Sequence, residues 1–143
     1  MQCAEVMKTD VVTVNPSDTA QVAARRMRDA DVGFLPVCDA EGKVLGTLTD
    51  RDIAIRLVAD DLPGGTSTVG DIMSREAIAC RPADEIAHVE QLMAEYRKSR
   101  ILVTDEAGRL FGVISLSDVA RLEEGPRRTA TTMRRVASRE TRL

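Results

Sequence analysis

The stretch GFLPVCDAEGKVLGTLTDRDI, residues 33–53, returns 66 positions later as SRILVTDEAGRLFGVISLSDV, residues 99–119. Each stretch holds two short apolar runs separated by a turn that contains Asp and Gly, a pattern that predicts a β-hairpin. Each hairpin then runs into a helix through the pattern G-h-h-S/T-x-x-D, where h is apolar: Gly46 to Asp52, and Gly112 to Asp118. The chain is therefore predicted to contain two copies of one small unit.

The repeat extends upstream, because residues 6–53 align with residues 72–119 without a gap. A short strand (11–14, or 77–80) is followed by Pro and an Asp cap that open a helix, and a second helix (50–60, or 116–124) follows the hairpin. The helical spacing predicts these buried faces for the first helix of each copy: Ala20, Ala23, Ala24 and Met27, and Ile86, Val89 and Met93.

The predicted order is thus strand, helix, strand, strand, helix in each copy, an α/β (α+β) fold. One copy of about 50 residues cannot cover its own sheet, so the two copies should pack about a pseudo-two-fold axis. The expected divisions are residues 1–60 for the first repeat, 61–70 for a linker rich in Gly, Ser and Thr, 71–124 for the second repeat and 125–143 for a basic tail.

The composition narrows the classes of function. Aromatic residues make up 2% of the 143 residues and Trp is absent, which leaves no stacking platform for nucleic-acid bases. No apolar run approaches the roughly 20 residues that span a bilayer. Glu5 and Asp10 lie where a signal peptide would be apolar. We expect a cytoplasmic protein.

The three cysteines, Cys3, Cys38 and Cys80, are widely spaced, and His88 is the one histidine. This set predicts neither a metal site nor a disulfide framework. Cys38 and Cys80 lie in apolar runs and are expected to be buried as small hydrophobic side chains, whereas Cys3 is a candidate for an exposed, reactive thiol. His88 is expected to have a packing or surface role.

The tail from residue 125 to 143 holds six arginines and one glutamate, and the rest of the chain has 14 basic and 22 acidic residues. After a helix stop at Gly125-Pro126, the spacing of Ala130, Met133 and Val136 predicts a weak amphipathic helix. Such a helix could dock on the acidic body or on a dimer mate. A disordered solubilising tail is an equal alternative, and binding of nucleic acid or an acidic partner ranks third.

The repeated Thr49-x-x-Asp52 and Ser115-x-x-Asp118 have two interpretations. A carboxylate in the first turn of a helix can accept hydrogen bonds from both hydroxyls of a ribose, while the Ser or Thr hydroxyl and nearby N–H groups meet phosphate. The same spacing is also a helix capping box, in which the two side chains only satisfy backbone amides. The two residues alone favour the cap.

The whole repeat resembles the CBS domain pair, named after cystathionine β-synthase and also called a Bateman module. The resemblance covers about residues 5–122 and includes DVVTVNPSDTA, GFLPVCDAEGKVLGTLTDRDI and KSRILVTDEAGRLFGVISLSDVA. It implies two sheets packed face to face with two clefts, and a homodimer shaped as a flat disc. It also implies that the chain binds AMP, ADP, ATP or S-adenosylmethionine.

Carried over to this sequence, the resemblance implies that Asp52 with Thr49, and Asp118 with Ser115, hold the ribose. For the first cleft it adds Ile78, Lys98, Gly33 and Phe34. For the second cleft it adds Val12, Val32, Gly33, Ser99 and Arg100. Because Phe34 stands where the second cleft has Arg100, the second cleft should be better suited to phosphate. Arg51 could reach a phosphate or form an ion pair, with equal expectation.

The sequence therefore predicts a regulatory, ligand-sensing module that binds an adenine nucleotide. The alternative is a structural or protein-interaction adaptor whose clefts no longer bind a ligand. We expect no catalysis and no cofactor, because the sequence shows no nucleophile with a base and no phosphate-binding glycine loop. The partner and the regulated process are not predicted.

Overall fold

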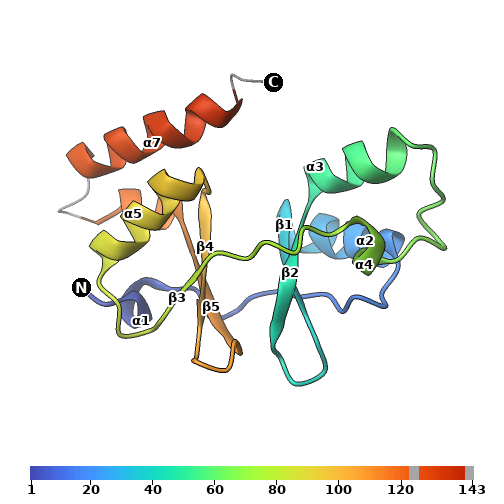
Figure 1. The fold of residues 1–143 in the computed structure, drawn as a ribbon, viewed down its shortest axis with the longest axis horizontal. Helices are drawn as coiled ribbons and strands as arrows, with labels where there is room; N and C mark the ends of the chain where they lie inside the picture. The colour runs from blue at the N-terminus through green and yellow to red at the C-terminus, as the bar shows by residue number, and fades with distance from the viewer. Residues whose placement is uncertain (123–125, 141–143) are drawn as a thin grey trace. The chain divides into compact units, whose positions relative to one another are not determined.

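The computed structural model describes residues 1–122 and 126–140, and they form two compact units (Figure 1). Unit 1 consists of Met1–Asp10 together with the described part of Ile78–Leu143, and unit 2 consists of Val11–Ala77. Each unit contains a β-hairpin and several helices, so the predicted α+β class is confirmed. The predicted helix stop at Gly125-Pro126 begins outside the described residues.

Unit 2 is built on an antiparallel hairpin of β1 (Phe34–Cys38) and β2 (Val44–Thr49). Its turn requires a glycine, because Gly42 has a φ of 81° that other residues rarely adopt. Helix α2 (Ala20–Ala30) precedes the hairpin, and α3 (Asp50–Ile53), the π-helical turn η1 (Ala54–Val58) and α4 (Val69–Ile72) follow it. The core of unit 2 consists of Val14, Ala20, Ala23, Met27, Leu35, Val37, Leu48, Leu57, Val69, Ile72 and Met73.

Unit 1 repeats this plan. Strands β4 (Arg100–Thr104) and β5 (Leu110–Ser115) form the antiparallel hairpin, and β3 (Ala79–Cys80) pairs in parallel with β4. The helices are α1 (Cys3–Val6), α5 (Ile86–Tyr96), α6 (Leu116–Ala120) and α7 (Pro126–Glu140). The core of unit 1 consists of Cys3, Cys80, Ile86, Val89, Met93, Ile101, Val103, Ile114 and Val119.

Each unit takes its first short helix from the other repeat of the sequence. Lys8, just after α1, pairs with Val113 of β5 in unit 1, and its repeat equivalent Ser74, just after α4, pairs with Thr47 of β2 in unit 2. The chain therefore passes between the units at residues 10/11 and 77/78. The units differ from the sequence repeats because the segment that leads into one repeat docks on the hairpin of the other.

The glycine that opens each G-h-h-S/T-x-x-D motif permits this docking. A Cβ atom on Gly112 would lie 2.7 Å from the carbonyl oxygen of Lys8, and one on Gly46 would overlap the carbonyl oxygen of Ser74. Only a residue without a side chain tolerates a backbone this close. The identity of Gly46 and Gly112 in the repeat thus has a structural cause.

The first strand of each repeat is shorter than predicted. Val14 forms a single parallel bridge to Val37, and β3 includes only Ala79 and Cys80 of the four predicted residues. The residues just before them lie next to the crossings between units at 10/11 and 77/78, and Ile78 still accepts a backbone hydrogen bond from Leu102 at 3.0 Å.

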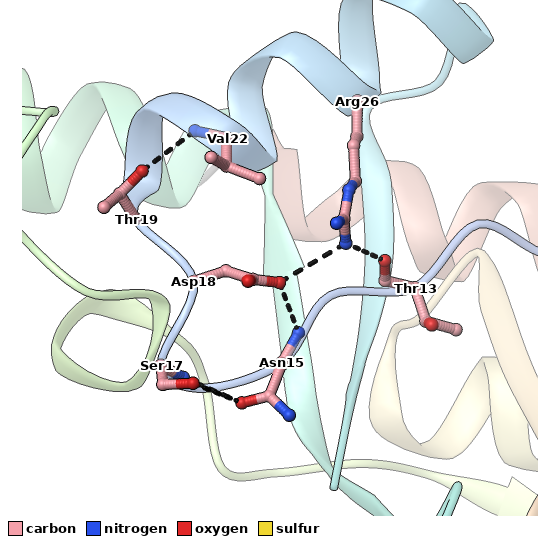
Figure 2. A network of polar contacts seen from close by, with 7 residues as sticks. All are labelled: Thr13, Asn15, Ser17, Asp18, Thr19, Val22 and Arg26. Atoms are coloured by element: carbon pink, nitrogen blue, oxygen red, sulfur yellow. Dashed lines mark hydrogen bonds and ion pairs between the residues drawn. The ribbon is translucent and has the colours of Figure 1, made fainter. Parts of the chain in front are cut away.

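The helix start at α2 corrects a second prediction. Thr19, not Asp18, is the N-cap: its Oγ1 accepts a hydrogen bond from the N–H of Val22 at 3.2 Å (Figure 2). Asp18 instead accepts a hydrogen bond from the N–H of Asn15 at 2.9 Å and closes the preceding turn. Figure 2 shows Arg26 fastening this turn to α2, since it pairs with Asp18 at 3.3 Å.

The same turn precedes α5, where Asp84 accepts a hydrogen bond from the N–H of Arg81 at 2.8 Å. Pro16 with Asp18, and Pro82 with Asp84, are therefore repeated because both copies need this turn.

The tail forms helix α7, which packs on α5 and α6 of its own unit (Figure 1). The predicted apolar face is wrong in part: Ala130 and Val136 are half-buried, but Met133 is 51% exposed and Thr132 is buried. The buried Ala24 predicted for α2 is also wrong, since Ala24 is exposed. Its repeat equivalent, Glu90 on α5, is buried. Helix α7 packs against α5 in unit 1, whereas α2 belongs to unit 2.

Candidate functional site

Thr49 and Asp52 form a capping box where β2 runs into α3. Thr49 Oγ1 accepts a hydrogen bond from the N–H of Asp52 at 3.1 Å, and Asp52 Oδ2 accepts one from the N–H of Thr49 at 3.0 Å. The last residue of the strand and the first turn of the helix hold the two side chains together. One of the two interpretations of the motif, the helix cap, is thus present in unit 2.

Ser115 and Asp118 make the same box where β5 runs into α6. Ser115 Oγ accepts from the N–H of Asp118 at 3.1 Å, and Asp118 Oδ2 accepts from the N–H of Ser115 at 2.9 Å. In both units the cap uses Oδ2 of the aspartate. Oδ1 of each carboxylate therefore lies outside the cap.

Basic side chains face these second carboxylate oxygens. In unit 1, Lys8 Nζ lies 3.3 Å and an Arg121 guanidinium nitrogen 3.7 Å from Asp118 Oδ1. In unit 2, Arg56 Nε lies 3.9 Å from Asp52 Oδ1. Each motif thus combines a hydroxyl, a carboxylate and at least one cation at a strand-to-helix corner.

The segments around α1 and α4, which dock on the hairpin of the other repeat, help to place these cations. Lys8 is fixed by two backbone hydrogen bonds with Val113, each of 3.0 Å. Arg56 donates to the carbonyl oxygens of Ile72 and Met73, at the end of α4, at 3.1 and 3.0 Å. The segment docking that defines each unit is therefore linked to the carboxylate of its motif.

Asp118 is the more deeply buried of the two aspartates, with 6% of its side chain exposed against 16% for Asp52. Burial by itself would raise the pKa of Asp118, but the hydrogen bonds from Ser115 and the neighbouring Lys8 ammonium outweigh burial and hold the pKa below its ordinary value. Asp118 is therefore ionised at neutral pH.

This lowered pKa has a consequence for stability. A carboxyl group whose pKa is lower in the folded than in the unfolded protein stabilises the fold above its unfolded pKa, near pH 4, and the contribution is lost as the pH falls through the folded pKa. We expect the stability advantage of wild type over Asp118→Asn to be full above about pH 5 and to shrink below about pH 4. Urea unfolding of both proteins between neutral pH and about pH 3 measures it; an advantage that grows with acidification would contradict the assignment.

Two further predicted residues, Arg100 and Ser99, lie at the corner in unit 1. Arg100 pairs with Ser115 in the strand register. The carbonyl oxygen of Ser99 accepts a hydrogen bond of 2.8 Å from the N–H of Leu116. The hydroxyl of Ser99 accepts one of 3.3 Å from the Arg100 guanidinium. Lys98 is half-buried just after α5, and Ile78 anchors β3 through its carbonyl oxygen, which accepts from Leu102.

In unit 2, Phe34 pairs with Thr49, as Arg100 does with Ser115. Gly33 accepts a hydrogen bond from the N–H of Asp50 at 3.0 Å, and a Cβ at Gly33 would lie 2.6 Å from the Asp50 carboxylate. The other predicted residues of this unit are exposed: Val12, Val32 and Arg51. Each predicted cleft combines residues of unit 1 with residues of unit 2. The structure describes where these residues lie within each unit.

Three basic residues of the site were not predicted. Arg56 follows Asp52 by four residues and Arg121 follows Asp118 by three, spacings that place ion pairs on one helix face and that the sequence displays. Lys8 lies far from Asp118 in the chain, so only the docking of α1 reveals the pair.

Within residues 1–122 and 126–140, no group of three or more His, Cys, Asp or Glu side chains is arranged to hold a metal ion. None of the helices in the described part of the chain is long and apolar enough to cross a membrane.

The family model for the CBS domain matches this chain twice, over residues 3–59 and 69–125. The chain belongs to the CBS domain family. The two matches coincide with the repeat, so each copy is one CBS repeat. The CBS domain-containing protein YhcV of Bacillus subtilis is 38% identical over 116 residues, which is 81% of each chain.

Solved structures of CBS proteins share the fold. Hypoxic Response Protein I, solved with two coordinated zinc ions, has a TM-score of 0.77 and 31% identity over 85% of this chain and 98% of its own. The CBS domain pair of protein MJ0100, solved with 5'-methylthioadenosine and S-adenosyl-L-methionine, has a TM-score of 0.76 and 26% identity over 87% of this chain and 97% of its own. Adenosine-containing ligands are thus bound by a structural neighbour of this CBS pair.

Proposed function

We propose that this CBS domain pair is a regulatory module that binds an adenine nucleotide without turning it over, with Asp118 and Ser115 at the ribose. The observation that carries the proposal is the carboxylate of Asp118. It is buried and ionised, its Oδ2 is used by the cap, and its Oδ1 lies at a corner lined by cations. A carboxylate oxygen has two lone pairs, so Asp118 can keep its cap and accept hydrogen bonds from a diol.

The charges around the two motifs favour phosphate in unit 1. Lys8, Arg100 and Arg121 are replaced at the equivalent positions of unit 2 by Ser74, Phe34 and Ile55. Unit 2 has Arg56 near its carboxylate. We infer that the corner of Asp118 prefers AMP, ADP or ATP, because cations attract phosphate and repel the sulfonium of S-adenosylmethionine. The corner of Asp52 has fewer charges with which to discriminate.

The adaptor alternative also has an observation in its favour. Both motifs are complete capping boxes, so helix stability alone accounts for their repetition. The two functions differ in one result: a cap without a binding role predicts that no adenine nucleotide binds at all.

Calorimetric titration of AMP, ATP and S-adenosylmethionine into the wild-type chain and into Lys8→Met tests both proposals. We expect wild type to bind ATP, and Lys8→Met to bind it roughly 3- to 10-fold more weakly, with a smaller effect at high salt because Lys8 is exposed. Affinity for S-adenosylmethionine should stay the same or rise.

Lys43→Met is the matched control, since Lys43 is an exposed lysine in the turn between β1 and β2. Equal losses in the two variants would contradict the role of Lys8. Absence of binding by all three compounds to wild type would support the adaptor instead.

A further inference from the structure

Two cysteines that are far apart in the sequence meet inside unit 1. Cys3 on α1 and Cys80 on β3 place their sulfur atoms 3.6 Å apart, across 77 residues of sequence. Both are buried, with 0% and 2% exposure. The prediction that Cys3 is exposed is therefore wrong, because α1 docks on this unit.

Backbone hydrogen bonds hold the two sulfur atoms together. The N–H of Cys3 donates to the carbonyl oxygen of Asp84 at 2.8 Å, and the N–H of Ala4 donates to that of Pro82 at 2.9 Å. These bonds fasten α1 to the turn that directly follows β3. The thiols are thus in contact because of the fold rather than by side-chain flexibility.

The equivalent positions in unit 2 are Val69 and Val14, and both are buried. The fold therefore needs two small apolar side chains here, and valine satisfies this need in unit 2. Unit 1 uses two thiols in the same places, and the third cysteine, Cys38, belongs to unit 2. A pair of valines is thus a ready control for the chemistry of the pair of thiols.

The two thiols have different acidities. The S–H of Cys80 donates a hydrogen bond to the sulfur of Cys3, which lowers the pKa of Cys3 against the opposing effect of burial, and raises that of Cys80. Cys3 is accordingly the sulfur that more readily forms the nucleophilic thiolate. Cys80 is placed to react with it in a second step.

We propose that Cys3 and Cys80 are an oxidation site that forms a reversible disulfide when a hydroperoxide reacts with the protein. The Cys3 thiolate attacks the peroxide oxygen, the O–O bond breaks, and Cys3 becomes a sulfenic acid. The sulfur of Cys80 then attacks the sulfur of Cys3, the S–O bond breaks, and water leaves with the Cys80 proton. Overall two thiols lose two protons and two electrons, and hydrogen peroxide is reduced to two molecules of water.

The disulfide acts on the segment that carries Lys8. Residues 1–10 include Cys3 and also Lys8, which pairs through its backbone with Val113 and through its ammonium with Asp118. Helix α1 is only four residues long, and local opening of so short an element admits the peroxide. The disulfide ties residues 1–10 to β3 and so keeps Lys8 at the carboxylate.

The test treats the full chain with hydrogen peroxide and compares wild type with Cys3→Val, Cys80→Val and the matched control Cys38→Val. In wild type and Cys38→Val we expect the intact mass to fall by two hydrogen atoms, a linked Cys3–Cys80 peptide, and reversal by dithiothreitol. The melting temperature should rise by about 5 °C or more on oxidation, because the crosslink closes a long loop. Neither valine variant at the pair should show these changes.

Three results would overturn the oxidation site: a sulfinic acid on Cys3 without the crosslink, crosslinks that involve Cys38, or no reaction when the urea-unfolded protein reacts fully. Hydrogen exchange tests the effect on Lys8 separately. The amides of Lys8 and Val113 should exchange roughly tenfold more slowly after oxidation. Unchanged exchange in the crosslinked protein would overturn the link to Lys8.

Discussion

Valine at Gly46 or at Gly112 is expected to lower the free energy of unfolding by about 3 kcal/mol or more. The first valine carbon would meet the carbonyl oxygen of Ser74 in unit 2, or that of Lys8 at 2.7 Å in unit 1. These carbonyl groups are backbone atoms and are paired with β2 and β5, so they cannot move aside without breaking the pairing. Gly46→Val should loosen the docked segment that contains Ser74, and Gly112→Val should loosen the docked segment that contains Lys8.

Gly65→Val is the matched control, since a Cβ there meets only Gln21 Oε1 at 3.8 Å. We expect it to change the unfolding free energy by less than about 1 kcal/mol. Urea unfolding followed by circular dichroism measures all three variants. Similar losses at Gly65 and Gly46 would show that the loss does not come from the docked backbone.

Replacement of Asp118 is expected to have the largest effect on ligand binding. Asp118→Ala removes the cap and the carboxylate together, and should lower the unfolding free energy by about 2 kcal/mol. Loss of hydrogen bonds between a charged group and a ribose should weaken AMP binding by about 10- to 100-fold.

Asp118→Asn separates the cap from the binding role. The asparagine carbonyl can still accept from the N–H of Ser115, so the cap survives, but the negative charge is lost. We expect a stability loss of only about 1 kcal/mol with a loss of affinity close to that of alanine. If asparagine restored both stability and full affinity, the charge of Asp118 would have no role in binding.

The repeat explains why most of the fold was predictable. Hairpin turns, apolar helix faces and the motif at residues 46–52 and 112–118 depend on neighbours in sequence, and duplication displays each of them twice. Ala24 was misassigned because its helix spacing matches that of buried residues, although only unit 1 has α7 against the equivalent helix. Asp18 was misassigned because the residue that closes a turn and the residue that caps a helix are adjacent.

The parts of the site that the sequence did not show depend on docking between distant segments. Lys8 reaches Asp118, and Cys3 reaches Cys80, only because α1 belongs to the unit formed by the second repeat. The role of Gly46 has the same cause, since nothing near it in sequence identifies Ser74 as its neighbour. Hairpin and helix patterns are local and contain no information about which sheet a preceding segment joins.

The direct test of the proposed function is calorimetric titration of AMP and of 2',3'-dideoxyadenosine monophosphate into wild type and Asp118→Asn. The two ligands share base and phosphate and differ only in the hydroxyls that Asp118 is proposed to bind. We expect wild type to prefer AMP by at least about tenfold and Asp118→Asn to lose this preference. Equal affinity of wild type for the two ligands, or binding of neither, would contradict the proposed function.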